Sequence, residues 1–178
     1  MTSSDPDLIA RALMDDRAAF GELVLRHQSA VRRFLRHLAG GDAALADDLA
    51  QETFIQAWRG LARFRGESNF STWLLGIAHN RWRNTRRQRK MEPQTANETA
   101  NENLPSPARA VELTQDLGAA MKRLDPDEQT ALHLFYQQGL THPEIAAVAG
   151  WPLGTVKTHL ARGKEKLRSL LAAWNPQA

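Results

Sequence analysis

Cysteine is absent from this chain of 178 residues. Its absence excludes disulfide frameworks, zinc sites with thiolate ligands and catalysis by a thiol nucleophile, and it agrees with a reducing compartment. Glycine and proline, with 11 and 8 residues, are near their average frequencies, so the composition fits neither a collagen-like repeat nor wholesale disorder. Because 42% of the residues are hydrophobic, the chain can bury a core in one or two domains.

Long hydrophobic runs are also missing. No apolar stretch approaches the roughly 18 residues that a membrane-spanning helix needs, and residues 1–5 are polar rather than the start of a signal peptide. We therefore expect a cytoplasmic protein with no membrane insertion. No segment alternates apolar and polar residues strictly enough to predict a strand, which favours an all-α fold.

Charge is distributed unevenly. Residues 1–90 hold 15 basic and 10 acidic side chains, whereas residues 109–178 hold 8 and 7. Residues 71–90 contain six basic side chains and no acid, and residues 42–58 contain four acids and no Lys or Arg. Each stretch can be read as a solvated helix face. A basic stretch also attracts a polyanion, so two opposed stretches on neighbouring helices indicate two different partners.

Helical periodicity and capping residues divide residues 1–90 into four helices. Asp5 followed by Pro6 is the predicted start of the first helix, and Asp16 and Asp42 begin the second and third. Residues 63–70 break the periodicity and predict a loop. The four predicted helices span about residues 5–14, 16–39, 42–61 and 71–90.

Residues 91–108 contain three Pro, three Asn and three Glu, with only two large apolar side chains. This composition predicts a flexible linker. At ~3.3 Å per residue the linker reaches roughly 60 Å when extended, more than one ~34 Å turn of duplex DNA. It can therefore tether the domains 1–90 and 109–178 to separate sites on one nucleic acid.

Residues 109–178 predict four more helices. Thr141 and Glu144 form a capping box, with Pro143 in the first turn of a short helix. This helix, a turn at Gly150 and a longer helix make a helix-turn-helix pattern. The predicted architecture is all-α: two small four-helix domains joined by a flexible linker.

The last predicted helix has a face that suits duplex DNA. Lys and Arg reach phosphates or guanine edges, Thr binds a phosphate or touches a thymine methyl, and the short helix can point its N–H groups at a phosphate. A helical hairpin with a solvated basic face is the alternative. Gly163 costs roughly 1 kcal/mol in a helix interior, and its place on the buried side predicts close packing. The candidate residues are Thr141, Thr155, Lys157, Thr158, Ala161, Arg162 and Lys164.

The basic stretch 71–90 carries a second candidate face. Asn80 and Asn84 lie one turn apart, and Asn reads base edges well although it is poor in a helix interior. Aromatic side chains beside a basic face can stack on unpaired bases, and the polar loop 66–70 could enclose one extruded base. In the alternative interpretation, Trp73 and Trp82 belong to the core and the Asn side chains are solvated.

Three motifs resemble the extracytoplasmic-function class (group IV) of bacterial sigma factors of the sigma-70 superfamily. They are residues 47–58, 64–74 and 154–158, and the resemblance spans about Leu8 to Leu171. It implies a transcription initiation factor that binds core RNA polymerase and directs it to promoters by reading the minus-35 and minus-ten elements and promoting strand opening. Residues 1–90 would form the region-two domain and residues 109–178 the region-four domain.

The resemblance also implies roles for individual residues. The acidic helix would dock on the clamp helices of the polymerase β′ subunit, and region four would contact the β flap. The residues that match the docking motif are Asp48, Gln51 and Glu52. The residues that would read and melt the minus-ten element are Arg65, Ser68, Asn69, Trp73, Asn80, Arg83, Asn84 and Arg87. The residues that would read the minus-35 element are Thr141, Thr155, Lys157, Thr158, His159, Arg162 and Lys164.

Two residues depart from the family pattern. His159 stands where Arg is common, which affects base preference, and Gly163 stands where Ala is usual, which affects the rigidity of the helix. No regulatory domain follows the last predicted helix, so we expect control by another protein, with an anti-sigma factor as an optional partner, or by the protein's own amount or chemistry.

Other classes of protein remain open. Residues 154–160 equally resemble the output domain of LuxR-type regulators, which bind promoters as dimers, but residues 1–90 lack the alternating strands and helices of a receiver. A sigma mimic that titrates an anti-sigma factor without binding DNA is a third reading, which the basic helix disfavours. The six His residues form no ligand-spaced i,i+4 pair with an acid. We therefore expect no enzyme, no metal and no other cofactor.

Overall fold

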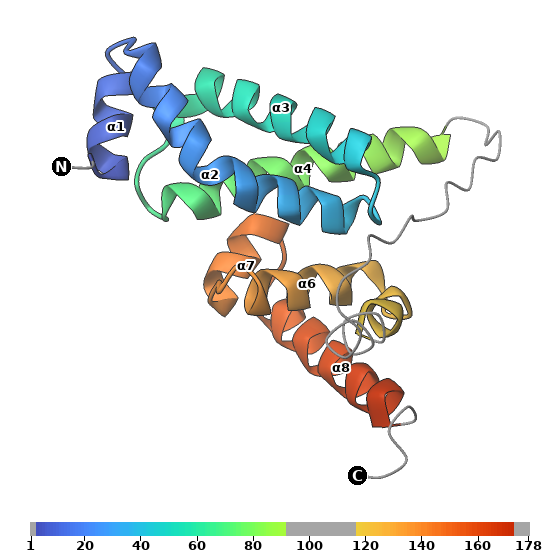
Figure 1. Cartoon of the computed structure of the whole chain (residues 1–178). Coiled ribbons are helices and arrows are strands. Elements are labelled where there is room, and N and C mark those ends of the chain that lie inside the picture. The colour runs from blue at the N-terminus through green and yellow to red at the C-terminus, as the bar shows by residue number, and fades with distance from the viewer. Residues whose placement is uncertain (1–2, 92–116, 173–178) are drawn as a thin grey trace, which may run out of the picture. The chain divides into compact units, whose positions relative to one another are not determined.

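The computed structural model describes residues 3–91 and 117–172. The chain divides into two compact units, Met1–Asn97 and Glu98–Ala178, called unit 1 and unit 2 below. All regular secondary structure in the described residues is helical (Figure 1), which confirms the predicted all-α fold. The predicted linker, residues 91–108, lies outside the described residues except for Met91.

Unit 1 begins with a capped helix, α1. The cap is Ser4 rather than the predicted Asp5: the Ser4 hydroxyl accepts from the Asp7 backbone N–H at 3.4 Å, and the Asp7 carboxylate accepts from the Ser4 backbone N–H at 3.1 Å. The Asp5 carboxylate instead bonds to the side chains of Arg26, at 3.1 Å, and His27, at 2.7 Å, in the next helix. The helices of unit 1 are α1 (Asp5–Ala12), α2 (Arg17–Leu38), α3 (Ala43–Gly60), the 3₁₀ helix η1 (Leu61–Arg63) and α4 (Phe70–Met91).

Aspartate caps begin α2 and α3, as predicted. Asp16 accepts the backbone N–H of Ala19 at 3.1 Å, and Asp42 accepts that of Leu45 at 3.0 Å. Each bond satisfies an N–H group that has no partner within its own helix. Helix α4 begins at Phe70, slightly earlier than the predicted start near residue 71 or 72.

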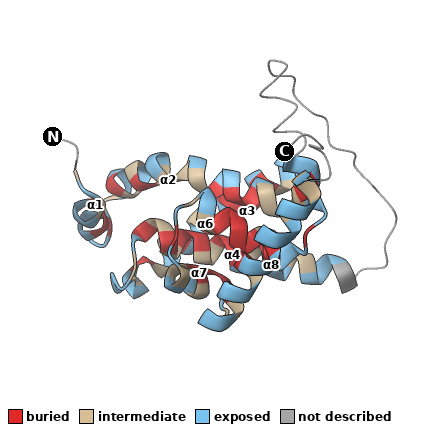
Figure 2. Cartoon of the chain, turned by 90° about the horizontal axis from the view of Figure 1, so that it is seen from below, coloured by how far each residue is buried: buried red, intermediate tan, exposed pale blue. Residues whose placement is uncertain are grey.

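The core of unit 1 forms where α2, α3 and α4 pack against one another, with α1 against α2. Buried and exposed residues alternate along the helices (Figure 2), as expected for helices that bury one side. Fully buried side chains from three helices meet there, and burial of such aliphatic and aromatic groups is the main stabilising term. They include Leu23, Phe34, Leu35, Ala46, Leu74, Leu75 and Ala78.

Unit 2 contains helical residues 117–122, α6 (Pro126–Tyr136), α7 (His142–Ala149) and α8 (Leu153–Ala172). The predicted capping box is present, because the Thr141 backbone N–H donates to Glu144 at 2.9 Å. Gly150 ends α7 with a φ of 70°, a left-handed conformation that glycine adopts without strain.

Gly163 lies at the contact between α6 and α8. A Cβ atom at this position would stand 2.8 Å from Cδ1 and 3.2 Å from Cγ of Leu132. Leu132 is buried, so it has little room to retreat. The structure thus confirms the predicted reason for this glycine, which is the close approach of two helices.

Candidate nucleic-acid interface

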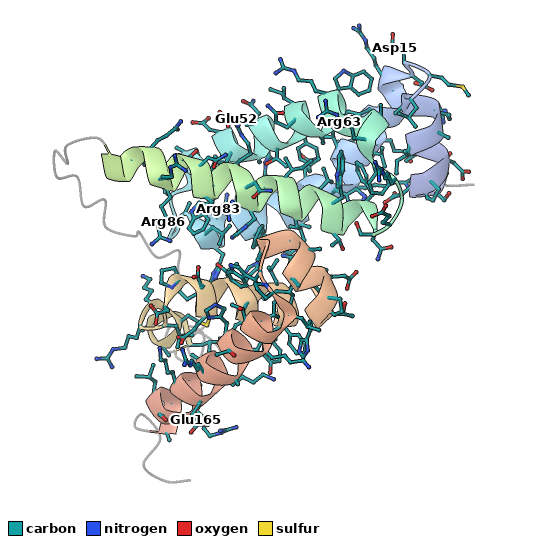
Figure 3. The ribbon with its side chains drawn as sticks, turned by 180° about the vertical axis from the view of Figure 1, so that it is seen from behind. Asp15, Glu52, Arg63, Arg83, Arg86 and Glu165 are labelled. Carbon is teal, nitrogen blue, oxygen red and sulfur yellow. The ribbon has the colours of Figure 1, made fainter. Side chains whose placement is uncertain are left out.

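Helix α4 separates a buried side from an exposed polar side. Leu74, Ala78 and Trp82 are buried, whereas Asn80 and Asn84 are exposed one turn apart. Two exposed basic residues, Arg83 and Arg87, lie beside them on the helix. Figure 3 shows Arg83 and Arg86 projecting from the C-terminal half of α4. The structure therefore brings the predicted amide and guanidinium groups of α4 to one accessible surface.

Trp73 is half-buried within an aromatic cluster. Its ring centroid lies 5.2 Å from that of Phe64 and 5.6 Å from that of Phe70, and a Cβ built on Gly60 would touch the indole at 3.7 Å. Phe70 in turn contacts His27 edge to face at 5.4 Å. Trp73 thus contributes to packing, as the alternative interpretation expected, and only part of its surface is accessible for stacking.

Trp82 is a core residue. It is 8% exposed, lies 5.8 Å from the His79 ring, and carries the Arg86 guanidinium over its face at 5.3 Å. Such a cation–π contact fixes the arginine against the helix. The packing interpretation therefore holds for this tryptophan.

The loop before α4 is polar and anchored at both ends. Phe64 and Phe70 contact each other edge to face at 5.6 Å, which closes the loop at its base. Gly66 has a φ of 71°, which permits the reversal. Between the anchors, Arg65 and Asn69 are exposed and Ser68 is partly exposed. This loop is therefore held by its aromatic ends and presents polar side chains to solvent.

Helix α3 exposes the predicted acidic face. Asp48, Gln51 and Glu52 are all exposed. Glu52 also forms an ion pair with Arg81 of α4, whose Nε donates to Oε2 at 2.9 Å. This pair was not predicted from the sequence, because the two residues are 29 positions apart and their contact depends on how α3 packs on α4. Glu52 thus belongs both to the acidic face and to a contact between helices.

Helix α8 presents the predicted basic face of unit 2. Lys157, Thr158 and Arg162 are exposed, and the Thr158 hydroxyl donates to the Gly154 carbonyl at 2.9 Å. Thr155 is partly exposed. On the other side, Val156, Leu160 and Gly163 are buried. The helix-turn-helix therefore directs its basic side chains away from the core.

Three other predicted residues of unit 2 have partners within the fold. The Thr141 hydroxyl donates to Glu144 at 2.7 Å. The His159 ring lies 4.8 Å from that of Trp151, with the two planes tilted by 50°. Lys164 Nζ lies over the rings of Phe135 and Tyr136, at 5.2 and 5.4 Å.

Tyr136 is an accessible residue of unit 2 that was not among the candidates predicted from the sequence. Its side chain is 63% exposed at the end of α6, beside Phe135 at 5.0 Å. Adjacent aromatic residues just before a glycine turn were the available signal. Because Lys164 lies over both rings, its amine is drawn toward α6, and Tyr136 belongs with the accessible surface of unit 2.

The described residues contain no candidate metal site and no candidate membrane-spanning helix. No group of three or more His, Asp or Glu side chains within residues 3–91 and 117–172 is arranged to hold a metal ion. Over the same residues, no helix combines the length and the apolar character needed to cross a membrane. Two helical units that each expose a basic helix are, however, the arrangement of a nucleic-acid-binding protein.

Comparisons with known proteins agree with this class. The family model of sigma-70 region 2 matches residues 23–91, and that of sigma-70 region 4 matches residues 114–167. The RNA polymerase sigma-H factor of Pseudomonas aeruginosa is 34% identical over 94% of this chain and 93% of its own length. The ECF RNA polymerase sigma-E factor of Escherichia coli is 32% identical over 92% of both chains.

Solved structures also resemble this chain. CnrH, in complex with the cytosolic domain of CnrY, has a TM-score of 0.72 and 29% identity, covering 96% of this chain and 99% of that one. The sigma factor RpoE of Bartonella quintana, in complex with the anti-sigma factor NepR, has a TM-score of 0.71 and 30% identity, covering 85% and 96%.

The chain belongs to the sigma-70 family of RNA polymerase sigma factors, in its extracytoplasmic-function class. It is a DNA-binding transcription factor that directs RNA polymerase in transcription initiation, so its partners are RNA polymerase and promoter DNA. The family is one of transcription regulators rather than of catalysts. These findings confirm the fold and function that the sequence motifs implied.

Proposed function

We propose that the two units divide the work of promoter recognition. Residues 1–90 dock on core polymerase and read and melt the minus-ten element, residues 109–178 read the minus-35 element, and residues 91–108 link them. The observation that carries this proposal is the separation of charge in unit 1, where an acidic face on α3 stands beside a basic face on α4. Opposite charges on adjacent helices suit a protein partner and a polyanion, respectively.

In this proposal, the exposed face of α3 docks on core polymerase. Asp48, Gln51 and Glu52 bind the clamp helices of the β′ subunit, and unit 2 contacts the β flap. Their exposure and shared face support this assignment, as does the family to which the chain belongs. Acidic groups on an exposed helix steer a basic partner at long range and hold it at short range.

Reading of the minus-ten element falls to α4 and the preceding loop. Asn80 and Asn84 contact base edges, while Arg83 and Arg87 contact phosphates, because amides pair with bases and guanidinium groups supply the salt-dependent attraction. The anchored loop, with Arg65, Ser68 and Asn69, encloses an extruded base. Trp73 supports this loop through its contacts with Phe64 and Phe70 and offers its remaining surface for stacking.

Reading of the minus-35 element falls to the helix-turn-helix of unit 2. Lys157 and Arg162 contact phosphates or guanine edges from the exposed face of α8, with Thr155 and Thr158 beside them. His159, held against Trp151, presents its ring edge to a base. The N-terminus of α7 at Thr141 points backbone N–H groups at a phosphate. Lys164 contributes charge from its place over the aromatic pair of α6.

Reconstituted transcription tests this division. The protein alone should bind duplex promoter DNA weakly, because each unit offers a small basic surface, and core polymerase should make binding tight, specific and competent for strand opening. Tight binding by a dimer without polymerase would favour a LuxR-type regulator. Failure to bind DNA with polymerase, combined with tight binding of an anti-sigma factor, would favour a sigma mimic.

We also propose that an anti-sigma factor controls this protein and that it acts in the cytoplasm, where polymerase and promoters meet. Support comes from the two similar structures, one solved with the anti-sigma factor NepR and the other with the cytosolic domain of CnrY. A cognate partner should prevent binding of core polymerase to the purified protein. Unchanged polymerase binding at saturating partner would contradict this mode of control.

A further inference from the structure

The ion pair between Glu52 and Arg81 has an asymmetric geometry. Arg81 donates from both Nε, at 2.9 Å, and Nη2 to the same carboxylate oxygen, Oε2. Two nitrogens of the guanidinium group therefore bind one oxygen of Glu52, and Oε1 does not take part in the pair. The two side chains are 35% and 47% exposed, with Arg81 the less accessible, so the carboxylate remains open to a partner while it is held.

We propose that Arg81 is a positioning residue for polymerase docking, which holds the Glu52 carboxylate in the orientation that the polymerase binds. The proposal rests on the docking role proposed above for α3. A glutamate on an exposed helix samples several rotamers, and ordering it on binding costs affinity. Two donors on one oxygen restrict those rotamers before the partner arrives, and Oε1 stays available for a basic group of the polymerase.

The position of Arg81 on α4 separates this role from DNA reading. Its neighbour Asn80 is exposed on the proposed reading face, whereas the Arg81 side chain reaches α3. Figure 3 shows Glu52 on the α3 side of the unit, with Arg83 and Arg86 at the opposite edge of α4. Arg81 therefore differs in its surroundings from the arginines assigned to phosphates, although all belong to one basic helix.

A double-mutant cycle on core polymerase tests the proposal. The dissociation constant of the full chain for core polymerase is measured for the wild type, Arg81→Gln, Glu52→Gln and the double variant. We expect Arg81→Gln to weaken binding about fivefold, from the lost ordering of one side chain, and Glu52→Gln to weaken it by at least as much. The double variant should bind no more weakly than Glu52→Gln, because Arg81 acts through Glu52 alone.

Two further variants separate positioning from charge and folding. Arg89→Gln removes the same charge from an exposed position of the same helix that lies outside the proposed DNA-binding set, and it should leave polymerase affinity unchanged. Arg81→Lys keeps a donor without the two guanidinium nitrogens and should recover part of the lost affinity. Melting temperatures of all variants should stay close to that of the wild type, because exposed ion pairs contribute little to stability.

The outcomes distinguish this proposal from the docking assignment on which it rests. Tighter binding by Arg81→Gln would show that Arg81 competes with the polymerase for Glu52, and an equal loss in the Glu52→Gln background would show that Arg81 acts independently of Glu52. Unchanged binding by Arg81→Gln alone would also overturn the positioning role. If Glu52→Gln left the affinity for polymerase unchanged, Glu52 would have no docking role. The positioning role proposed for Arg81 would then be excluded as well.

Discussion

Unit 1 and unit 2 present their functional side chains in different ways. In unit 1 the candidate residues come from α3, the loop and α4, and two of them also contact other residues of the unit: Glu52 bonds to Arg81, and Trp73 packs on Phe64 and Phe70. In unit 2 most of them lie on one exposed face of α8, opposite its buried face. Function and folding therefore share side chains in both units: in unit 2 Thr141, His159 and Lys164 have partners within the fold, whereas Lys157 and Arg162 project from the exposed face of α8.

The ion pairs between helices differ between the two units. In unit 2, Lys166 of α8 bonds to the buried Glu128 of α6 at 2.8 Å and to Asp125 at 3.3 Å. None of these three residues belongs to the proposed DNA-binding set. Substitution of the exposed Lys157 or Arg162 in unit 2 should therefore perturb stability less than substitution of the half-buried Trp73 in unit 1.

The largest expected effect follows charge reversal on α3. Asp48→Lys combined with Glu52→Lys should weaken binding of core polymerase by about 100-fold or more, because like charges would face the partner. Stability should fall by only about 0.2–1 kcal/mol, since an exposed ion pair is lost. Asp127→Lys with Glu165→Lys is the control, because it changes net charge equally and breaks the Glu165 pair with Arg168 in unit 2. Unaltered affinity of the α3 variant in equilibrium titrations would refute the docking assignment.

The second expected effect is on stability alone. Trp73→Ala should destabilise unit 1 by about 2 kcal/mol, roughly half the cost for a fully buried tryptophan, and Trp73→Phe should cost less. Tyr136→Ala in unit 2 is the comparison, since Tyr136 is also aromatic but exposed, and should cost less than about 0.5 kcal/mol. Denaturant unfolding measures both. Equal, small losses in the free energy of unfolding would mean that Trp73 contributes little to the stability of unit 1.

A smaller effect concerns glycine in α8. Gly163→Ala gains about 1 kcal/mol of helix propensity but forces a methyl group against buried Leu132, and such overpacking costs about 1–3 kcal/mol. We expect a net loss of about 1 kcal/mol. Gly154→Ala is the control, because nothing lies within 4 Å of its added Cβ, and it should be neutral or stabilising. A gain in stability for both variants in thermal unfolding would show that the two helices can separate at little cost.

The smallest expected effect is on the pH dependence of stability, at acid pH in unit 1 and at alkaline pH in unit 2. Hydrogen bonds from the Ser4 side chain and backbone lower the pKa of Asp7, so its contribution is present at neutral pH and is lost as pH falls below about 4. A hydrogen bond to Glu128 raises the pKa of Lys166, so its contribution is lost as pH rises above about 10. Scanning calorimetry should find that Asp7→Asn flattens the acid limb and that Lys166→Met flattens the alkaline limb. An unchanged acid limb in Asp7→Asn, or an unchanged alkaline limb in Lys166→Met, would contradict this assignment.

Local signals predicted much of this structure. Asp16, Asp42 and Thr141 marked helix starts, and Gly150 marked a helix end, because capping depends on residues within one turn. Gly163 was predicted from its position in the helical period. The N-cap of α1 was misplaced by one residue, because Ser4 and Asp5 are both good caps and the choice depends on bonds from Asp5 to α2.

Contacts between helices could not be predicted in the same way. The pairing of Glu52 with Arg81 and the placement of Lys164 over Phe135 and Tyr136 depend on the packing of helices that are distant in sequence. Periodicity shows which side of a helix is buried, and it leaves open which residue of a neighbouring helix lies opposite. Candidate site residues could therefore be proposed from residue type and helix face, whereas the partners of those residues required the structure.

The division of labour between the units is tested most directly by strand opening on a panel of promoter variants. Permanganate reactivity reports melting, and salt-dependent binding reports docking of the polymerase holoenzyme. Asn80→Ala and Asn84→Ala should impair melting and relax discrimination at single minus-ten positions, at roughly 1–3 kcal/mol per lost base contact. Lys157→Ala and Arg162→Ala should weaken closed complexes with a shallower salt dependence, and leave melting of bound complexes unchanged. If the Asn variants instead lowered affinity equally on all promoters and opened strands normally, α4 would be a phosphate clamp and the account would be wrong.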